Sequence, residues 1–108
     1  MINVKFKKVA GNLVSFKVSG HADFDEYNRD IVCSGVSVLT YAIINGITEV
    51  IKVKADFEVR DGFSTLSLKE QSLEDIEKCQ VLMETMLLEI KSMEIQYGKY
   101  ITLKIEEV

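Results

Sequence analysis

Cys33 and His21 are the two side chains of this sequence whose chemistry could support catalysis. The 108-residue chain has one histidine and two cysteines. A thiolate is a strong nucleophile, and a neighbouring imidazole can lower the pKa of the thiol and then protonate a leaving amine. Because there is a single histidine, any cysteine–histidine chemistry in this chain must use His21. The pair therefore indicates nucleophilic catalysis, provided that the fold brings residues 21 and 33 together.

The position of Cys33 in the sequence favours its activation. It follows Asp30 by three residues, where a helical pattern begins. We predict Asp30 as the N-cap of that helix, which places Cys33 in the first turn. There the helix dipole and the unpaired N–H groups favour a thiolate and could stabilise an oxyanion. A second interpretation stays open: His21 pairs with Asp23 or Asp25 at the surface, and Cys33 is a small core residue.

The remaining candidates give weaker predictions. Cys79 lies on an apolar helical stripe between Ile76 and Met83, so we predict a buried core thiol. The acidic residues between 23 and 30 lack the spacing of a calcium loop. One histidine and two distant cysteines cannot supply a structural zinc, haem or iron–sulfur site, so we expect no metal and no cofactor. Asp61-Gly62 is predicted to be a hairpin turn and nothing else.

Two helical patterns are separated by segments with strand alternation. Apolar residues alternate with polar ones over 2–7, 14–18, 55–60, 66–68 and 101–105, which predicts five strands. A stripe from Val32 to Val50 predicts the first helix, although Asn45-Gly46 leaves a break open. A second stripe from Ile76 to Tyr97 predicts a longer helix, preceded by a capping-box pattern at Ser72.

These elements predict one domain, residues 1–108, in the order ββαββαβ. Each strand has one apolar face and each helix one apolar stripe, which is typical of an α+β fold. We expect a two-layer sandwich, with a five-stranded mixed sheet and two helices. A chain of this length can bury a core without disulfides or metal.

Composition and charge limit the cellular compartment and the kinds of partner that we expect for this chain. The net charge is −4 and the pI is near 5.0. Such a chain lacks the overall positive field of nucleic-acid-binding proteins, so we expect no direct nucleic acid partner. The N-terminus has no apolar segment typical of a signal peptide, and we expect no stretch near the roughly 20 apolar residues that span a bilayer. Two cysteines in unlike settings indicate the reducing cytoplasm and no membrane partner.

Two linked sequence blocks resemble a known family. The first is Gly20-His21-Ala22, and the second is Asp30-Ile31-Val32-Cys33, followed by the small residues Ser34-Gly35 and then Val36-Ser37. Both blocks, with their order and separation, are similar to those of the ribosomal-processing cysteine protease family, Prp. The resemblance covers the full length, including Asn45-Gly46 in the first helix and the longer second helix.

The resemblance implies a function and a site. Members of the family remove an N-terminal extension from large-subunit ribosomal protein twenty-seven during ribosome assembly, after hydrophobic and typically aromatic residues. By resemblance Cys33 is the nucleophile and His21 its acid/base. Apart from the resemblance, we interpret Asp30 as the helix cap, or as a residue that orients His21. The family forms homodimers. The loop between the blocks is expected to order around the substrate peptide, and here it consists of Ala22, Asp23, Phe24, Asp25, Glu26, Tyr27, Asn28 and Arg29.

The loop departs from the family pattern, and two other functions stay open. Relatives often have Gly and Ala in this loop, whereas Asp23, Phe24 and Asp25 are bulkier. Asn28 can adopt the left-handed conformation that a glycine would supply. The main alternative is a non-enzymatic peptide-binding or ribosome-assembly module, which would have no need of a thiol at a helix start. A redox-sensing thiol protein is a third possibility, although the chain has no Cys-x-x-Cys pair.

Overall fold

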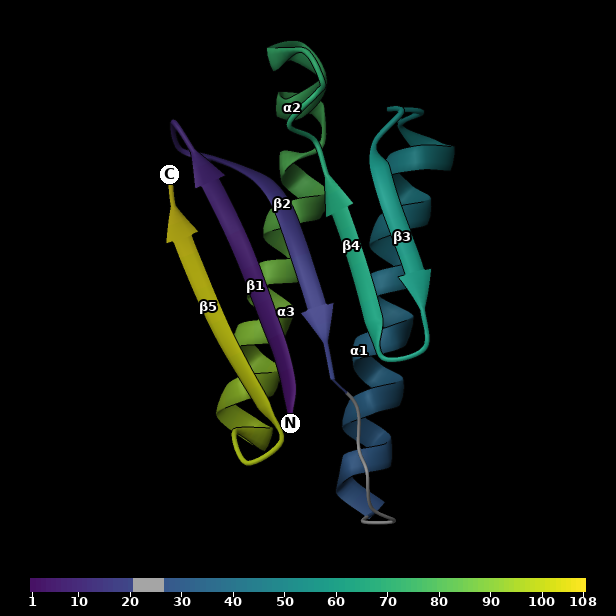
Figure 1. Ribbon diagram of the computed structural model, residues 1–108, viewed down its shortest axis with the longest axis vertical. Coiled ribbons are helices and arrows are strands. Elements are labelled where there is room, and N and C mark those ends of the chain that lie inside the picture. The colour runs from purple at the N-terminus through teal and green to yellow at the C-terminus, as the bar shows by residue number, and fades with distance from the viewer. Residues whose placement is uncertain (21–26) are drawn as a thin grey trace.

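The predicted α+β architecture is confirmed. The computed structural model describes residues 1–20 and 27–108, with residues 27–30 described by their backbone alone. A five-stranded mixed sheet forms one layer, and the helices cover one of its faces (Figure 1). The elements in chain order are β1 (Ile2–Val9), β2 (Asn12–Ser19), α1 (Tyr27–Asn45), the π-helical turn η1 (Gly46–Val50), β3 (Asp56–Arg60), β4 (Phe63–Ser67), α2 (Leu73–Lys78), α3 (Gln80–Tyr97) and β5 (Ile101–Glu107).

The sheet has the strand order β3-β4-β2-β1-β5. Strand β5 pairs parallel to β1, and the other neighbouring strands are antiparallel. The alternating residues face the core as predicted, because Phe6 lies opposite Phe16 and Phe16 opposite Leu66, all buried. The rings of Phe6 and Phe16 pack with their centroids 6.1 Å apart. Period-two patterning thus sets which face of the sheet meets the helices.

The predicted apolar stripe of the first helix is confirmed up to Asn45-Gly46, where the sequence left a break open. Its members Val32, Val36, Ile43 and Ile47 are buried. At η1 the N–H of Ile51 donates to the carbonyl of Gly46 at 2.9 Å, an i→i+5 bond. The wider turn takes the next residue of the stripe out of register, so Val50 is 78% exposed. A Cβ on Gly46 would lie 2.7 Å from Cδ1 of Leu82, so glycine permits the close approach of α3.

This helical segment is longer and more apolar than expected. Residues Ile31–Val50 form a 20-residue window that by length and composition alone could cross a membrane. The expectation that no stretch approaches this length is therefore wrong. The buried stripe of α1 packs against the sheet, which accounts for the apolar character on its inner side.

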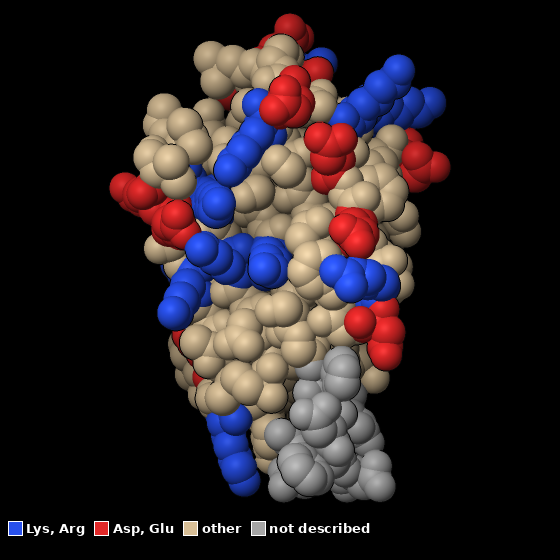
Figure 2. Space-filling model, viewed as in Figure 1, with Lys and Arg blue, Asp and Glu red and all other residues tan. Residues whose placement is uncertain are grey.

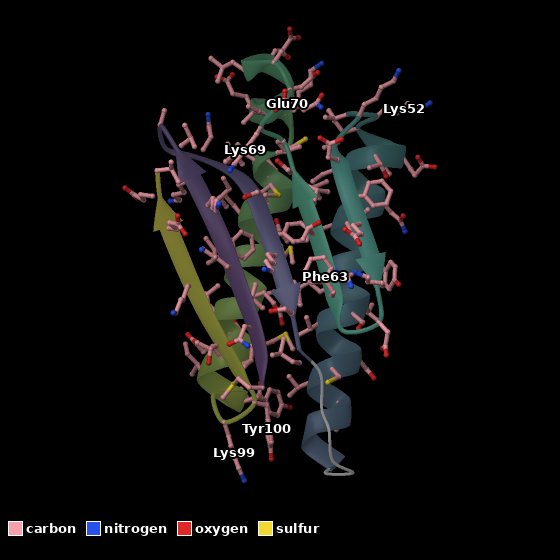
Figure 3. All side chains as sticks on the ribbon, viewed as in Figure 1. Lys52, Phe63, Lys69, Glu70, Lys99 and Tyr100 are labelled. Carbon is pink, nitrogen blue, oxygen red and sulfur yellow. The ribbon has the colours of Figure 1, made fainter. Side chains whose placement is uncertain are left out.

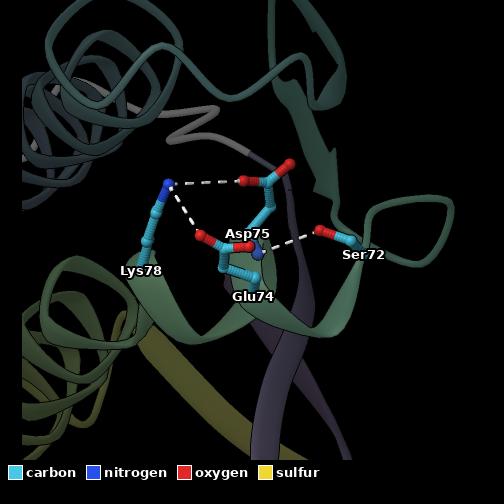
Figure 4. A network of polar contacts seen from close by, with 4 residues as sticks. All are labelled: Ser72, Glu74, Asp75 and Lys78. Atoms are coloured by element: carbon cyan, nitrogen blue, oxygen red, sulfur yellow. Dashed lines mark hydrogen bonds and ion pairs between the residues drawn. The ribbon is translucent and has the colours of Figure 1, made fainter.

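The second helical segment is divided at Cys79. The predicted cap is confirmed, because the Ser72 hydroxyl accepts from the N–H of Asp75 at 3.2 Å and begins α2 (Figure 4). Lys78 lies 3.5 Å from a carboxylate oxygen of Glu74 and also pairs with Asp75. The stripe continues across the break into α3, where Met83, Met86 and Ile90 are buried. The methionines are therefore core residues, as their spacing predicted.

Candidate active site

One pocket on the helix side of the sheet includes Cys33. It has a volume of about 300 Å³ and lies between α1, the end of β2 and the β3–β4 hairpin. Helix α1 contributes one side of the pocket with Cys33, Val36, Ser37, Thr40 and Tyr41. The sheet contributes Ile2, Val18 and Gly20, and the hairpin contributes residues 59–64. A thiol therefore lies at a pocket whose lining is partly apolar and partly polar.

Cys33 is half-buried and packs against the edge of the core. Neither Cys33 nor Cys79 forms a disulfide. Ser37 and Thr40 follow Cys33 at helical spacings of four and seven residues, so they share its face of α1. The hydroxyl of Thr40 donates to the carbonyl of Val36 at 2.7 Å, which satisfies this buried side chain. This helical spacing was a signal that could have identified these lining residues from the sequence.

The predicted start of α1 is wrong. The helix begins at Tyr27, so Asp30 is its fourth residue and not its N-cap, and Cys33 is its seventh residue. No glycine or proline lies between Tyr27 and Cys33, so nothing in the sequence stops the helix from extending upstream of the apolar stripe. Cys33 therefore lies in the second turn. The helix dipole acts mainly within the first turn, and the N–H of Cys33 is directed to the carbonyl of residue 29 within the helix.

The predicted substrate loop is shorter than expected. Tyr27, Asn28 and Arg29 belong to α1. Ala22, Asp23, Phe24, Asp25 and Glu26 lie outside the described residues, and so does His21. The proximity of Cys33 and His21 therefore stays a prediction.

Gly20 is the last described residue before His21, and it lines the same pocket as Cys33. Its N–H donates to the carbonyl of Gly62 at 2.9 Å, which joins the end of β2 to the β3–β4 turn. Its φ of +95° is in the region that favours glycine, and a Cβ there would overlap the carbonyl oxygen of Met1. The hydrogen bond to Gly62 therefore holds the backbone before His21 at the pocket, and the positive φ and the close approach to Met1 require glycine at this position.

The β3–β4 hairpin is a part of the pocket that sequence reasoning missed. Asp61 and Gly62 form the predicted turn, but they also line the pocket, so the prediction that they are a turn and nothing else is wrong. The guanidinium carbon of Arg60 lies 4.2 Å from the centre of the Phe63 ring, and Nε of Arg60 lies 3.0 Å from Glu58. Figure 3 shows Phe63 at the start of β4. Only the pairing of β4 with β2 brings the hairpin here, and the sequence does not specify that pairing.

Cys79 has the surroundings predicted for a core thiol. It is fully buried, and burial raises the pKa of the Cys79 thiol, with a smaller contribution from the carboxylate of Asp75. Within residues 1–20 and 31–108, no three His, Cys, Asp or Glu side chains are grouped in a way that could hold a metal ion.

The family model for the cysteine protease Prp matches residues 1–102. The chain belongs to the Prp cysteine protease family. The ribosomal processing cysteine protease Prp of Bacillus subtilis is 32% identical over 92 residues, covering 79% of each chain. The Prp of Staphylococcus aureus is 27% identical over 93 residues, covering 86% of this chain and 87% of the relative. The two motif blocks thus identified the family correctly.

Solved structures agree with this assignment to Prp. SMU.848 from Streptococcus mutans has a TM-score of 0.90 and 29% identity, covering 100% of this chain and 99% of its own. S. aureus Prp in complex with a substrate peptide has a TM-score of 0.85 and 26% identity, covering 98% of this chain and all of its own. Another structure of that Prp, with a covalently linked product peptide, has a TM-score of 0.81, 28% identity and the same coverage.

Proposed function

We propose that this chain is a cysteine endopeptidase that removes the N-terminal extension of large-subunit ribosomal protein twenty-seven. The observation that carries the proposal is the Cys33 thiol at a pocket of about 300 Å³, in a chain that matches Prp over residues 1–102. The relative that binds a substrate peptide shares the fold over nearly the whole chain. The apolar lining from Ile2, Val18 and Val59 suits a hydrophobic or aromatic side chain before the cleaved bond.

The proposed reaction uses Cys33 as the nucleophile and His21 as its acid/base. His21 takes the thiol proton, and the sulfur attacks the scissile carbonyl to form a tetrahedral intermediate. His21 then protonates the leaving amine, which releases the mature protein and leaves a thioester on Cys33. Water, deprotonated by His21, hydrolyses the thioester and frees the N-terminal peptide. The fixed position of Gly20 at the pocket supports this pairing, because His21 is the next residue.

Asp30 is the residue that we propose to orient His21. As the fourth residue of α1 it lies about one helical turn before Cys33. We propose that the residues from Ala22 to Arg29 contact the substrate. Those after Glu26 would do so from the first turn of α1. We propose that the reaction takes place in the cytoplasm.

Cleavage of the full-length ribosomal protein of the same organism tests the proposal. We expect the wild-type chain to shorten it at the N-terminus, as read by intact mass. Cys33→Ala and His21→Ala should reduce the rate at least 1000-fold. Cys79→Ala, whose thiol lies in the core, should retain cleavage and so serves as the matched control. Undiminished cleavage by Cys33→Ala, or an intact substrate with the folded wild-type chain, contradicts the proposal.

A peptide-binding module is the second candidate, favoured by one observation. Cys33 lies in the second turn of α1, where the helix dipole helps a thiolate less than in the first turn. Such a module would bind the extension and leave its mass unchanged, so the cleavage assay separates the two functions.

We propose that the chain acts as a homodimer. Val81, Leu88 and Ile95 repeat every seven residues along α3 and are 63–88% exposed, so they form an apolar row on its outer side. Light scattering should give twice the chain mass for the wild type and the chain mass for Leu88→Lys. Glu89→Lys, a charge change beside the row, should remain a dimer.

A further inference from the structure

The outer face of the sheet carries lysines in direct register. Lys5 on β1 lies opposite Lys17 on β2 and opposite Lys104 on β5. These three side chains form a row across three neighbouring strands, which are about 4.8 Å apart. Like charges directly opposite each other destabilise a sheet. Packing of the core does not require this arrangement, since Lys17 and Lys104 are exposed.

Two further lysines extend the row into a patch. Lys7 follows on β1, and Lys69 lies just beyond the end of β4 (Figure 3). We call Lys5, Lys7, Lys17, Lys69 and Lys104 the lysine face. Figure 2 shows Lys and Arg side chains gathered across the middle of this side of the molecule. Two shallow hollows of about 250 and 300 Å³ lie between these lysines.

Few carboxylates neutralise the lysine face. Glu106 on β5 pairs with Lys5. A hydrogen bond from Lys5 lowers the pKa of Glu106, and the charges of Lys5, Lys7 and Lys69 lower it further. Among the described residues no carboxylate lies within 4.0 Å of the ammonium group of Lys7, Lys17, Lys69 or Lys104. The face is therefore positive, although the whole chain carries a net charge of −4.

The composition of the face favours a phosphate backbone over a protein surface. A protein interface has apolar or aromatic anchors at its centre. The outward residues of β1, β2 and β5 up to the bulge near Lys7 are lysine, serine, threonine, asparagine and glutamate. The neighbouring Phe63 already has Arg60 over its ring at 4.2 Å and Lys17 at 5.6 Å. Phosphate contacts need only cations and polar groups.

We propose that the lysine face binds the phosphate backbone of RNA, without reading its sequence. This goes beyond the proposed protease function and does not depend on it. The expectation of no nucleic acid partner rested on net charge, whereas binding depends on the charge of the contacting face. The lysine face lies on the outer side of the sheet and the Cys33 pocket mainly on the helix side, with Phe63, which lies beneath Lys17, at the rim of the pocket.

Fluorescence anisotropy with a labelled 16-base-pair RNA duplex of arbitrary sequence tests the proposal. If about four phosphates are contacted, the affinity should fall roughly 100-fold between 50 and 200 mM salt. Lys17→Glu with Lys104→Glu should weaken binding at 50 mM salt at least tenfold and reduce the salt dependence. Both substitutions place a carboxylate opposite Lys5, so the sheet should stay folded.

The matched control makes the same change of net charge elsewhere. Lys91→Glu with Lys99→Glu, on α3 and in the turn after it, should bind RNA within twofold of the wild type. If the charge-reversed face were to unfold, Lys17→Gln with Lys104→Gln would replace it, with a smaller expected loss. No binding at 50 mM salt, or equal weakening by both pairs, overturns the proposal. Equal competition by a glutamate-rich peptide would assign the face to an acidic protein instead. Cleavage of the ribosomal protein is measured separately, so failure here leaves the protease proposal untouched.

Discussion

The two thiols of this chain have the same chemistry and opposite surroundings. Cys33 is half-buried at a pocket, whereas Cys79 is fully buried where α2 meets α3. The sequence distinguished them correctly, because Cys79 belongs to an apolar stripe and Cys33 precedes small and polar residues. It could not specify the turn of the helix on which Cys33 lies, because no residue marks the start of α1.

Thiol labelling should resolve this difference directly. In the native protein iodoacetamide should modify one cysteine per chain, and peptide mapping should place the adduct on Cys33, because a buried thiol is protected. In guanidinium, where the chain is unfolded, iodoacetamide should modify both cysteines. Cys33→Ala should give no native labelling within the same time. Native modification of Cys79 at a comparable rate would show that the core around it is open.

Alkaline pH should destabilise the fold through Cys79. Burial raises the pKa of this thiol above its ordinary value of 9.0, so the native state holds the proton more tightly than the unfolded chain. The resulting stability is fully present below pH 9 and is lost as the pH rises toward the higher native pKa, by up to about 1.4 kcal/mol per pH unit. Urea unfolding at pH 8 to 10.5 should show this loss in the wild type and not in Cys79→Ala. An equal loss of stability in the wild type and in Cys79→Ala would show that other titrating groups cause it.

Among the elements, most local signals were read correctly, the start of α1 excepted, whereas contacts between distant segments were not predicted. The Ser72 cap and the Asp61-Gly62 turn are short-range features, and both are present. The π-helical turn at Gly46 lies beside Leu82, a contact that no local pattern contains. The hairpin wall of the pocket likewise depends on β4 pairing with β2.

Gly20 provides a test of how the end of β2 is held at the pocket. Gly20→Ala should lower the free energy of unfolding by about 2–4 kcal/mol, because it adds a steric overlap with Met1 to an unfavourable positive φ. Gly11→Ala is the matched control, since Gly11 has φ +83° and a Cβ there would meet nothing within 4 Å. It should cost about 1 kcal/mol. Equal losses in urea unfolding would contradict the close contact with Met1.

At the scale of the whole molecule, two surfaces point to partners that composition alone did not indicate. The lysine face is positive in a chain of net charge −4, because among the described residues Lys5 is the one of its five lysines with a carboxylate partner. The apolar row on α3 is exposed, and the proposed pairing with a second copy would cover it. Net charge and overall hydrophobicity average over these faces, which explains why the sequence totals did not reveal them.

The mass of the enzyme during turnover shows whether Cys33 forms a covalent bond with the substrate. A peptide spanning the extension and the first mature residues is mixed with the protein and quenched in acid within the first turnover. We predict a species heavier by the N-terminal fragment minus one water, with the thioester on the peptide that contains Cys33. It should be absent in Cys33→Ala and present in Cys79→Ala. Product formation with no such adduct under conditions that trap thioesters, or an adduct on Cys79, would contradict the assignment of Cys33 as the nucleophile.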